Sequence, residues 1–348
     1  MKIFVNARFL TQPVSGVQRY GIECSRQIKK LHPEVVFLAP KNILHKDIAK
    51  ELDVKTIGVN TGHLWEQLDL PLYLSRNGSP PLFSPANTAP LLYNNNYFTL
   101  HDLAFYHYPE WNSKAFSTWY NIMVPKLVHS SRHIFTVSQS IRDEIIKYYR
   151  VLPSKVSVTY NGISAQMMAE RRGRGIEKEK IILAVGTFSK RKNHQNLVKA
   201  FLESRIKDEY QLVIIGDRNK VFAETGIDEN LLTRENIKIY ERLSSEELIG
   251  MYAKAEILVS LSVYEGFGIP VLEGLYSGCK VICSDISVYR ELYNGYATFC
   301  DPNDLESISA TLSEVALMTV NSVKNIDLLL YKYNYTRSAQ IIIEAMLK

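Results

Sequence analysis

Short apolar runs alternate with helical patterns along the chain, and this alternation constrains the fold more than any other feature of the sequence. Strands that are each followed by a helix are typical of parallel sheets, so the pattern predicts the α/β class. In the first half, the strand candidates are Lys2–Asn6, Glu34–Leu38, Tyr97–His101, His133–Val137 and Lys155–Thr159. The clearest helical patterns there cover Val17–Leu31, Lys114–Ser130 and Ser138–Tyr149.

A polar stretch, Ser164–Lys180, divides the alternation into two series. Glycine interrupts it twice, and this composition is typical of a linker between domains. Beyond it, the strand candidates are Ile181–Val185, Tyr210–Ile215, Ile257–Leu261, Lys280–Cys283 and Ala297–Phe299, and helical patterns begin at His194, Ser245 and Pro270. Since a length of 348 residues suits about two domains, we predict two doubly wound, Rossmann-like domains that face each other across a cleft.

The domain boundaries follow from this division. The first domain is predicted to cover residues 1–163, the linker residues 164–179 and the second domain residues 180–320. The last stretch, 321–348, is helical and carries no strand candidate, so we expect helices that pack back towards the first domain.

Composition excludes several classes of protein. Hydrophobic residues at 46% and charged residues at 22% are ordinary for a folded protein and exclude wholesale disorder. The longest charge-free run, 77–101, contains four prolines and does not suit a membrane-spanning helix. Arg8 interrupts the apolar core that a signal peptide needs, and the four scattered cysteines do not suit a disulfide scaffold. We therefore expect a reduced, cytoplasmic protein.

Charge is unevenly distributed along the chain. Residues up to Lys180 include 23 Lys and Arg against 14 Asp and Glu, whereas the remainder include 18 against 22. One interpretation is a solvated surface of uneven composition. The other is that the first half faces an anionic partner, either a membrane leaflet or a nucleic acid.

The strongest local signal is the segment Ser262–Ile282, SVYEGFGIPVLEGLYSGCKVI. The loop Glu265-Gly266-Phe267-Gly268 follows a strand candidate, and Pro270 stands where the first residue of a helix is expected. Glycines let the backbone approach a ligand closely, and the free amides at a helix start suit an anion such as a diphosphate. Glu265 and Glu273 flank this anion site and can accept hydrogen bonds from sugar hydroxyls. The alternative is a plain strand–loop–helix turn, but two glutamates that bracket the loop favour a functional site.

A basic cluster lies in the segment Val185–Leu197, VGTFSKRKNHQNL. Gly186 opens a turn after a strand candidate, and Lys190, Arg191 and Lys192 precede a helix. The carboxyl ends of parallel strands are where α/β proteins bind ligands, and Arg191 and Lys192 can donate charge-assisted hydrogen bonds to phosphate oxygens. Taken alone, the triplet of cations favours a solvated basic turn.

His101 and Asp102 come directly after the strand pattern that starts at Tyr97. A histidine in that place, followed by an acid, can act as a positioned donor or base, although most lone histidines are structural. Cys279 and Cys283 lack a nearby set of histidines, which favours buried thiols over a zinc site. The sequence contains no G-x-x-x-x-G-K-[ST] loop, and no G-x-G-x-x-G follows the first strand candidate, so neither P-loop hydrolysis nor a nicotinamide dehydrogenase is supported.

Together these segments resemble the retaining glycosyltransferases of the GT-B fold, in sequence family 4, of the bacterial surface-polysaccharide and lipopolysaccharide type. The resemblance covers nearly the whole chain. The matching segments are SGVQRY (Ser15–Tyr20), HDL (His101–Leu103), TVS (ending at Ser138), YNGI (Tyr160–Ile163), VGT…RKN (Val185–Asn193), EGFGIPVLE (Glu265–Glu273) and the stretch from SGCKVI to Asp301-Pro302. The two glutamates of EGFGIPVLE, with seven residues between them, are highly specific.

The resemblance implies a role for each matched residue. The first domain would bind the acceptor and the second the nucleotide-sugar donor. Glu265 would contact the hydroxyls of the transferred sugar and Glu273 the ribose, while His101 would face the reacting sugar. Arg191 and Lys192 would hold the diphosphate, so that His101, Glu265, Arg191 and Lys192 form the catalytic set. The implied donor-binding residues are Gly16, Gly186, Arg191, Lys192, Gly266, Phe267, Gly268, Ile269 and Glu273.

The reaction implied by the resemblance is hexosyl transfer with retention of configuration, in the synthesis of O-antigen, lipopolysaccharide or capsule. GDP-mannose is the favoured donor, with dTDP- and UDP-sugars as alternatives, and the acceptor is a saccharide or a lipid-linked saccharide. No cofactor or metal is expected, because the two cations and the helix amides would neutralise the leaving diphosphate. Two residues depart from the family pattern: Thr187 stands where some relatives carry arginine, and Gly274 replaces the usual alanine, which is expected to loosen the helix.

Two alternative functions share these features. One is a GT-B sugar-nucleotide epimerase, and the other is a non-catalytic scaffold of a polysaccharide assembly complex. A lipid-linked acceptor would also explain the basic first half, since a basic face near Trp111, Trp119 and Tyr120 could rest on the anionic inner face of the plasma membrane. No nucleic-acid partner is then expected.

Overall fold

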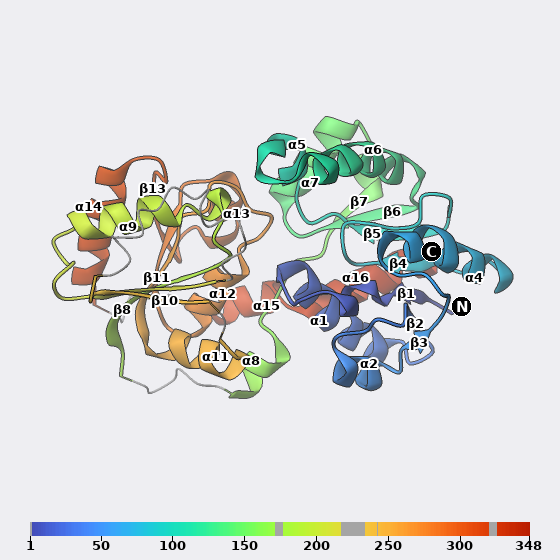
Figure 1. Cartoon of the computed structure of the whole chain (residues 1–348), viewed down its shortest axis with the longest axis horizontal. Helices are drawn as coiled ribbons and strands as arrows, with labels where there is room; N and C mark the ends of the chain where they lie inside the picture. The colour runs from blue at the N-terminus through green and yellow to red at the C-terminus, as the bar shows by residue number, and fades with distance from the viewer. Residues whose placement is uncertain (1, 171–176, 217–233, 242, 320–325) are drawn as a thin grey trace. The chain divides into compact units, whose positions relative to one another are not determined.

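The computed structural model of the chain describes residues 2–170, 177–216, 234–241, 243–319 and 326–348. It divides into two compact units, the first formed by Met1–Ser164 with Lys332–Lys348 and the second by Ala165–Tyr331 (Figure 1). Each unit has a parallel sheet with helices on both faces. The predicted α/β class, with two Rossmann-like domains, is confirmed.

The division of the chain differs in detail from the predicted boundaries. The second unit begins with helix α8 (Ala165–Glu170), inside the stretch that was expected to be a linker. Its sequence, AQMMAE, is rich in helix-forming residues and buries Met167, which explains why it is helical. Residues 171–176 of the predicted linker lie outside the described residues. The chain returns to the first unit at Lys332, and helix α16 (Tyr335–Leu347) then packs along α1 (Gly16–Leu31).

The sheet of the first unit has seven parallel strands in the order β3-β2-β1-β4-β5-β6-β7. Its strands are β1 (Phe4–Asn6), β2 (Val36–Ala39), β3 (Lys55–Thr56), β4 (Leu82–Ser84), β5 (Asn96–Thr99), β6 (His133–Thr136) and β7 (Val156–Val158). From β1 the strand order runs outward in both directions, so the point where it reverses lies between β1 and β4. Open parallel sheets bind ligands beyond the carboxyl ends of the strands at such a switch point.

Helices cover both faces of this sheet (Figure 1). One face carries α1, α2 (Lys46–Leu52) and α16, and the other carries α5 (Ala104–His107), α6 (Lys114–Ser130) and α7 (Gln139–Tyr149). A continuous helical run also connects β3 to β4, formed by α3 (Gly62–Leu64), the π-helical turn η2 (Trp65–Asp69) and α4 (Leu70–Arg76). Shorter 3-10 turns are η1 (Ala7–Thr11), η3 (Pro109–Trp111) and η4 (Pro153–Lys155). Serine caps fix two helix starts, since Ser113 and Ser138 accept hydrogen bonds from backbone amides of α6 and α7.

The sheet of the second unit has six parallel strands in the order β10-β9-β8-β11-β12-β13, with its switch point between β8 and β11. Its strands are β8 (Glu179–Val185), β9 (Gln211–Ile215), β10 (Ile237–Tyr240), β11 (Ala255–Ser260), β12 (Lys280–Ser284) and β13 (Thr298–Cys300). Among the described residues, its helices after α8 are η5 (Lys190–Lys192), α9 (His194–Glu203), α11 (Ser245–Lys254), α12 (Ile269–Tyr276), α13 (Ser287–Tyr293), α14 (Leu305–Leu317) and α15 (Asp327–Lys332).

The core of the second unit lies between the sheet and helices α9 and α14, while α11 and α12 cover the opposite face (Figure 1). Buried side chains from both helices, among them Phe201 and Leu312, meet inward residues of β8, β9 and β11 such as Ile182, Leu212 and Ile257. Strands apolar on both faces are expected where helices cover both sides of a parallel sheet. The packed sheet thus provides a rigid support for the loops at its carboxyl edge.

Several features of the fold differ from those predicted from the sequence. Strand β5 ends at Thr99 and does not include His101, and the short strands β3, β4 and β10 were not predicted. All four cysteines are buried free thiols, as expected for Cys279 and Cys283. Among the described residues, no helix combines the length and the apolar character needed to cross a membrane.

Candidate functional site

The switch point of the second unit brings the two strongest motifs together. Strands β8 and β11 are parallel neighbours, so the segments that follow them leave the sheet at the same edge. The basic cluster follows β8, and the EGFG loop, Glu265–Gly268, follows β11. A backbone hydrogen bond of 2.9 Å, from the amide of Val263 to the carbonyl of Arg191, joins the two segments. Residues about seventy positions apart in the chain therefore form one site.

An ion pair lies at the centre of this site. The Lys192 Nζ donates to Glu265 Oε1 at 2.5 Å, and a guanidinium nitrogen of Arg191 lies 4.0 Å from Glu265 Oε2. Burial alone would raise the pKa of Glu265, but attraction to Lys192 and Arg191 outweighs it and lowers that pKa to about 2. Glu265 is therefore a carboxylate at neutral pH. In the sequence the cations and the glutamate belong to two separate motifs, whereas in the structure they form ion pairs with each other.

The start of α12 follows the predicted pattern with a shift of one residue. The helix begins at Ile269, so Pro270 is its second residue, where a missing N–H is still tolerated. Gly268 is the N-cap and has a φ of +82°, a conformation that favours glycine. The first-turn amides of a helix have no intrahelical partners. They supply the donors that an anion at this edge of the sheet would need.

Two tyrosines of α13 hold the EGFG loop, and neither was predicted from the sequence. A Cβ atom on Gly268 would lie 2.4 Å from Cε1 of Tyr289, so the ring occupies the space that a side chain would need. The Tyr293 hydroxyl donates to the carbonyls of Gly268 and Phe267, at 3.1 and 3.3 Å. In a trans peptide the N–H points opposite to the C=O. Tyr293 therefore turns the amides of Gly268 and Ile269 away from itself.

The hydroxyl of Tyr289 connects this support to Glu265. It lies 2.7 Å from Ser260 Oγ, at the end of β11, and also hydrogen-bonds Ser262. Ser262 in turn hydrogen-bonds the carboxylate of Glu265. The only trace of this arrangement in the sequence is the spacing of Tyr289 and Tyr293, which puts both on one face of a helix.

Helix α12 lies unusually close to β11 at Gly274. A Cβ atom at that position would lie 2.4 Å from Leu258 Cδ2. The missing side chain lets α12 pack directly on the strand, and the expectation that Gly274 loosens the helix stays a prediction. Glu273, the neighbouring residue, is buried on the same helix.

Hydrogen bonds from neighbouring elements hold the turn after β8 in place. The amide of Gly186 donates to Ile215 O at 2.9 Å, and its carbonyl lies 3.2 Å from Nε2 of His194. Burial lowers the pKa of His194 to about 4, so this histidine is neutral at pH 7. A Cβ on Gly186 would lie 3.0 Å from Cε of Lys192, which shows that the lysine stem lies directly over the glycine.

Gly16 and His101 belong to the first unit, whereas Glu265 and its cations belong to the second. Gly16 is the first residue of α1, and Tyr20 of that helix contacts the His101 ring edge-on at 4.9 Å. His101 Nε2 lies 2.7 Å from the carbonyl of Pro85, and burial lowers the pKa of its imidazole. Because a carbonyl can only accept, Nε2 carries the proton, and Nδ1 is left as an acceptor. His101 is thus not placed to donate from Nε2 to a ligand.

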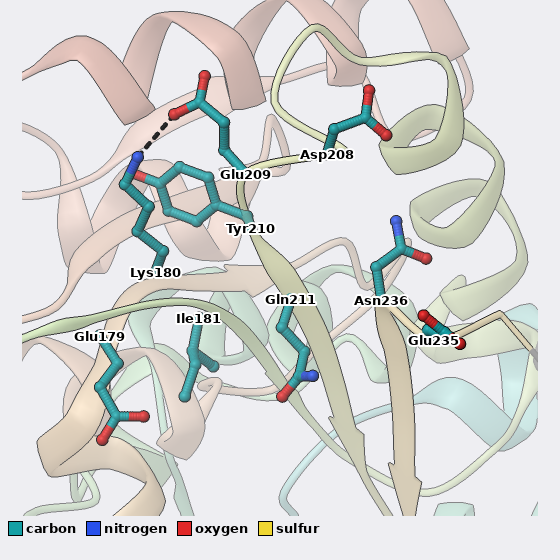
Figure 2. Close-up of a pocket in the computed structure, with 9 residues that line it drawn as sticks. All are labelled: Glu179, Lys180, Ile181, Asp208, Glu209, Tyr210, Gln211, Glu235 and Asn236. Carbon is teal, nitrogen blue, oxygen red and sulfur yellow. Dashed lines mark hydrogen bonds and ion pairs between the residues drawn. The ribbon is translucent and has the colours of Figure 1, made fainter.

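The hollow drawn in Figure 2 lies at the opposite edge of the second unit's sheet. It has a volume of about 430 Å³ and is lined by residues at the amino ends of β8, β9 and β10. Three of its charged groups are already paired, because Lys180 Nζ lies 2.6 Å from Glu209 and Glu179 forms an ion pair with Lys254. None of the predicted site residues lines it. Among the described residues, no group of three His, Cys, Asp or Glu side chains could hold a metal ion.

Comparisons with known proteins agree with this geometry. The family model described as Glycosyltransferase Family 4 matches residues 77–166, and the one described as Glycosyl transferases group 1 matches residues 167–326. The chain is similar to the O-antigen chain mannosyltransferase RfbU of Salmonella typhimurium, with 28% identity over 74% of this chain and 70% of that protein. It is also 28% identical to the O-antigen chain mannosyltransferase B of Escherichia coli, over 61% of this chain and only 58% of that relative's length. The crystal structure of Anabaena Alr3699/HepE with UDP and glucose superposes with a TM-score of 0.73 at 14% identity, covering 100% of this chain and 99% of HepE.

Proposed function

This chain belongs to the family 4 glycosyltransferases and has the GT-B fold, and from that premise we propose that it transfers a hexose from a nucleotide-diphosphate sugar. The acceptor is a saccharide or a lipid-linked saccharide, and the product is part of an O-antigen, lipopolysaccharide or capsule. The observation that carries the proposal is the Glu265 carboxylate, paired with two cations beside the start of α12 at the switch point of the second unit.

The donor's diphosphate would bind where the cations and the helix amides converge. Arg191 and Lys192 donate to phosphate oxygens, and the amides of Gly268 and Ile269 add neutral donors. Negative charge grows on the diphosphate as the sugar leaves, so donors fixed in advance at this place lower the barrier. A phosphate group would compete with Glu265 for the two cations. Glu265, still ionised, is then available to accept hydrogen bonds from hydroxyls of the transferred sugar.

We infer that transfer retains the anomeric configuration and needs no metal. The EGFG loop holds one carboxylate, Glu265, whose strong ion pair makes it a poor covalent nucleophile. Positive charge from Arg191, Lys192 and the helix start can stabilise the leaving diphosphate directly. Two measurements test this: the anomeric configuration of the product by NMR, and the rate after treatment with a chelator. An inverted product or loss of activity with the chelator would contradict the inference.

Mannose is the hexose that the relatives' names favour, and GDP-mannose is the donor that we propose first. UDP- and dTDP-sugars are the alternatives, and the HepE structure contains UDP and glucose. Thermal shift with GDP, UDP and dTDP separates these donors, since a ligand that binds the folded state raises its melting temperature. Conversion of the bound donor in the absence of any acceptor would instead indicate an epimerase. A chain that binds none of the three would indicate a scaffold.

Contact with an anionic membrane is a further part of the proposal. Helix α6 exposes Phe116 and Ile122 on its surface together with Lys114 and Lys126. Tyr120, one of the aromatics expected to contact the membrane, is buried and stacks on Phe116 at 4.1 Å, so it is not available. Sedimentation with anionic and neutral liposomes at two salt concentrations tests the contact. Equal sedimentation with both kinds of liposome would contradict it.

A further inference from the structure

The switch point of the first unit carries a second cluster of polar side chains, which no sequence motif marks. It lies between β1 and β4, and the last residues of these strands, Asn6 and Ser84, both take part. The Nδ2 atom of Asn6 lies 3.4 Å from Ser84 Oγ. In doubly wound domains this is the edge at which ligands bind.

A buried carboxylate, Glu66, organises the cluster. Its Oε1 accepts hydrogen bonds from Asn6 Nδ2 at 2.7 Å, Arg8 Nε at 3.2 Å and Thr88 Oγ1 at 3.0 Å. Arg8 also donates to Thr88 Oγ1 at 2.7 Å. A buried charge is costly unless it is paired and hydrogen-bonded, and here one carboxylate oxygen has three donors. Glu66 is therefore fixed in position.

The other carboxylate oxygen, Oε2, faces a residue at the surface. His63 Nδ1 lies 3.4 Å from it, and the His63 side chain is 43% exposed. The negative charge of the buried carboxylate favours a proton on the ring nitrogen that faces it, Nδ1, and this leaves Nε2 to contact a ligand. A carboxylate beside one ring nitrogen is a common way to present the other nitrogen of a histidine in a fixed direction.

The helix that carries both residues contains the π-turn Trp65–Asp69, a rare element that is frequent at functional sites. Neighbouring groups hold the turn in place. Trp65 Nε1 donates to Ile57 O at 2.9 Å, and the Gln67 amide donates to Ala89 O and accepts from the amide of Leu91. The turn is thus anchored on both sides of Glu66.

An exposed aromatic ring lies beside His63. The Trp119 side chain of α6 is 37% exposed, and its ring centroid lies 6.2 Å from that of His63 in an edge-on arrangement. An aromatic face next to an oriented polar atom suits a sugar ring, which offers apolar C–H faces and hydroxyl groups together. A purely apolar ligand could not form a hydrogen bond with the imidazole, and the carboxylate of Glu66 would repel an anion.

The cluster is also connected to His101. Thr88 forms hydrogen bonds with both Arg8 and Glu66. The residue before it, Asn87, accepts a hydrogen bond through Oδ1 from the backbone amide of His101 at 2.8 Å. His63 and His101 are therefore linked through one short segment at the same edge of the first unit's sheet.

We propose that His63 and Trp119, with His63 positioned by the buried Glu66, form the subsite that binds the saccharide acceptor. This inference rests on the proposed function, and it assigns the residues that recognise the second substrate. Nε2 of His63 accepts a hydrogen bond from an acceptor hydroxyl, and Trp119 stacks on the sugar ring.

Tryptophan fluorescence of the full chain tests the subsite directly. The sequence has three tryptophans, of which Trp65 is buried and Trp111 stacks on Tyr108 at 3.9 Å. The probes are methyl glycosides of mannose, glucose, galactose, rhamnose and N-acetylglucosamine, together with mannobiose. We expect at least one probe to change the fluorescence, His63→Ala to weaken its binding about tenfold, and Trp119→Ala to abolish the signal. Trp111→Phe is the matched control and should keep the response.

Two further readouts separate the possible failures. Nucleoside diphosphate affinity, measured by calorimetry, should be the same in the His63 and Trp119 variants as in the unchanged chain, because Arg191, Lys192 and the start of α12, which would hold the diphosphate, lie in the other unit. Glu66→Gln tests the positioning role of Glu66. This variant should bind the probe more weakly than the unchanged chain, and the double variant with His63→Ala should bind it no more weakly than His63→Ala alone. If the chain binds a nucleoside diphosphate but none of the probes, or if both surface variants bind a probe normally, the inference is wrong. If no nucleoside diphosphate binds at all, the proposed function fails first.

Discussion

The two units each place a buried glutamate beside cations at the switch point of a parallel sheet, but the two clusters differ in their access to ligand. Arg8 is 7% exposed and, with Asn6 and Thr88, surrounds one oxygen of Glu66. Lys192 and Arg191, the partners of Glu265, are 12% and 27% exposed. Both glutamates have a pKa of about 2, because neighbouring positive charge outweighs the effect of burial. We therefore expect a fixed cluster in the first unit and an exchangeable cluster in the second, where a ligand's phosphate can replace Glu265 as the partner of the cations.

The largest expected effect is on stability, at the fixed cluster. Arg8→Met leaves Glu66 buried without its cation, and breaking a buried pair in this way costs about 3–5 kcal/mol. Lys192→Met leaves Glu265 with Arg191 as a remaining cation, so the loss is smaller, about 1–3 kcal/mol. Urea unfolding of both variants measures the two costs. Equal losses would contradict the distinction between a fixed and an exchangeable cluster.

The second effect concerns the support of the exchangeable site. Gly274→Ala introduces a Cβ that would lie 2.4 Å from Leu258, so we expect a loss of about 1–3 kcal/mol in unfolding free energy. Gly250→Ala in α11 is the matched control, because a Cβ there has no atom within 4 Å among the described residues. Helix propensity alone should then stabilise the chain by about 0.5–1 kcal/mol. A stabilising Gly274→Ala would show that α12 does not pack closely on β11.

A smaller effect is expected at the loop that orients the amides. Tyr293→Phe removes the hydroxyl that holds the carbonyls of Gly268 and Phe267. The loop amides are then less well oriented, and the Kd for a nucleoside diphosphate should rise about tenfold, which corresponds to roughly 1.4 kcal/mol. Tyr252→Phe is the control, because it also removes the hydroxyl of a buried tyrosine, but in α11. The backbone carbonyl of Tyr252, which accepts a hydrogen bond from Lys178, is unchanged by this substitution. If both variants bind equally well, Tyr293 has only a packing role.

The smallest effect is a change in the pH dependence of stability. The folded pKa of Glu265, about 2, lies below its ordinary value of 4.5. Its carboxylate therefore contributes stability that is fully present above about pH 4.5 and is lost as the pH falls towards 2. Glu265→Gln removes this contribution, so the unfolding free energy of the variant should fall less steeply over that interval. Parallel curves for the two proteins, measured by urea unfolding at several pH values, would contradict the assigned pairing.

The parts of the second unit's candidate site are visible in the sequence because each of them is local. Glu265, Gly268 and Pro270 belong to one strand–loop–helix segment, and the cations directly follow another strand. Glycine and proline mark such turns through their backbone preferences, which a sequence displays. The α/β class was predicted for the same reason, since the alternation of strands and helices is visible along the chain.

The first unit's cluster and the tyrosines of α13 could not be predicted in this way. Glu66 is 58 residues from Arg8 and 22 from Thr88, and only the folded sheet brings them together. A π-turn has no reliable sequence signature, so nothing in the segment containing Glu66 indicated a site. Strand β3 has two exposed residues and β4 lies in a proline-rich run, which explains why neither was predicted. The strand was predicted to reach His101 but ends two residues earlier, at Thr99, and the tautomer of His101 depends on the carbonyl of Pro85.

The central claim is that Glu265 acts on the transferred sugar, and one paired substitution tests it most directly. Glu265→Gln should lower the rate of sugar transfer at least about a hundredfold, as expected when a group that stabilises the transition state loses its charge. Glu256→Gln is the matched control, because Glu256 also bonds a lysine of the second unit, Lys280, at 2.7 Å, but near the amino end of β11. The control should transfer sugar at the normal rate. Normal transfer by Glu265→Gln, with the donor bound, would contradict the claim.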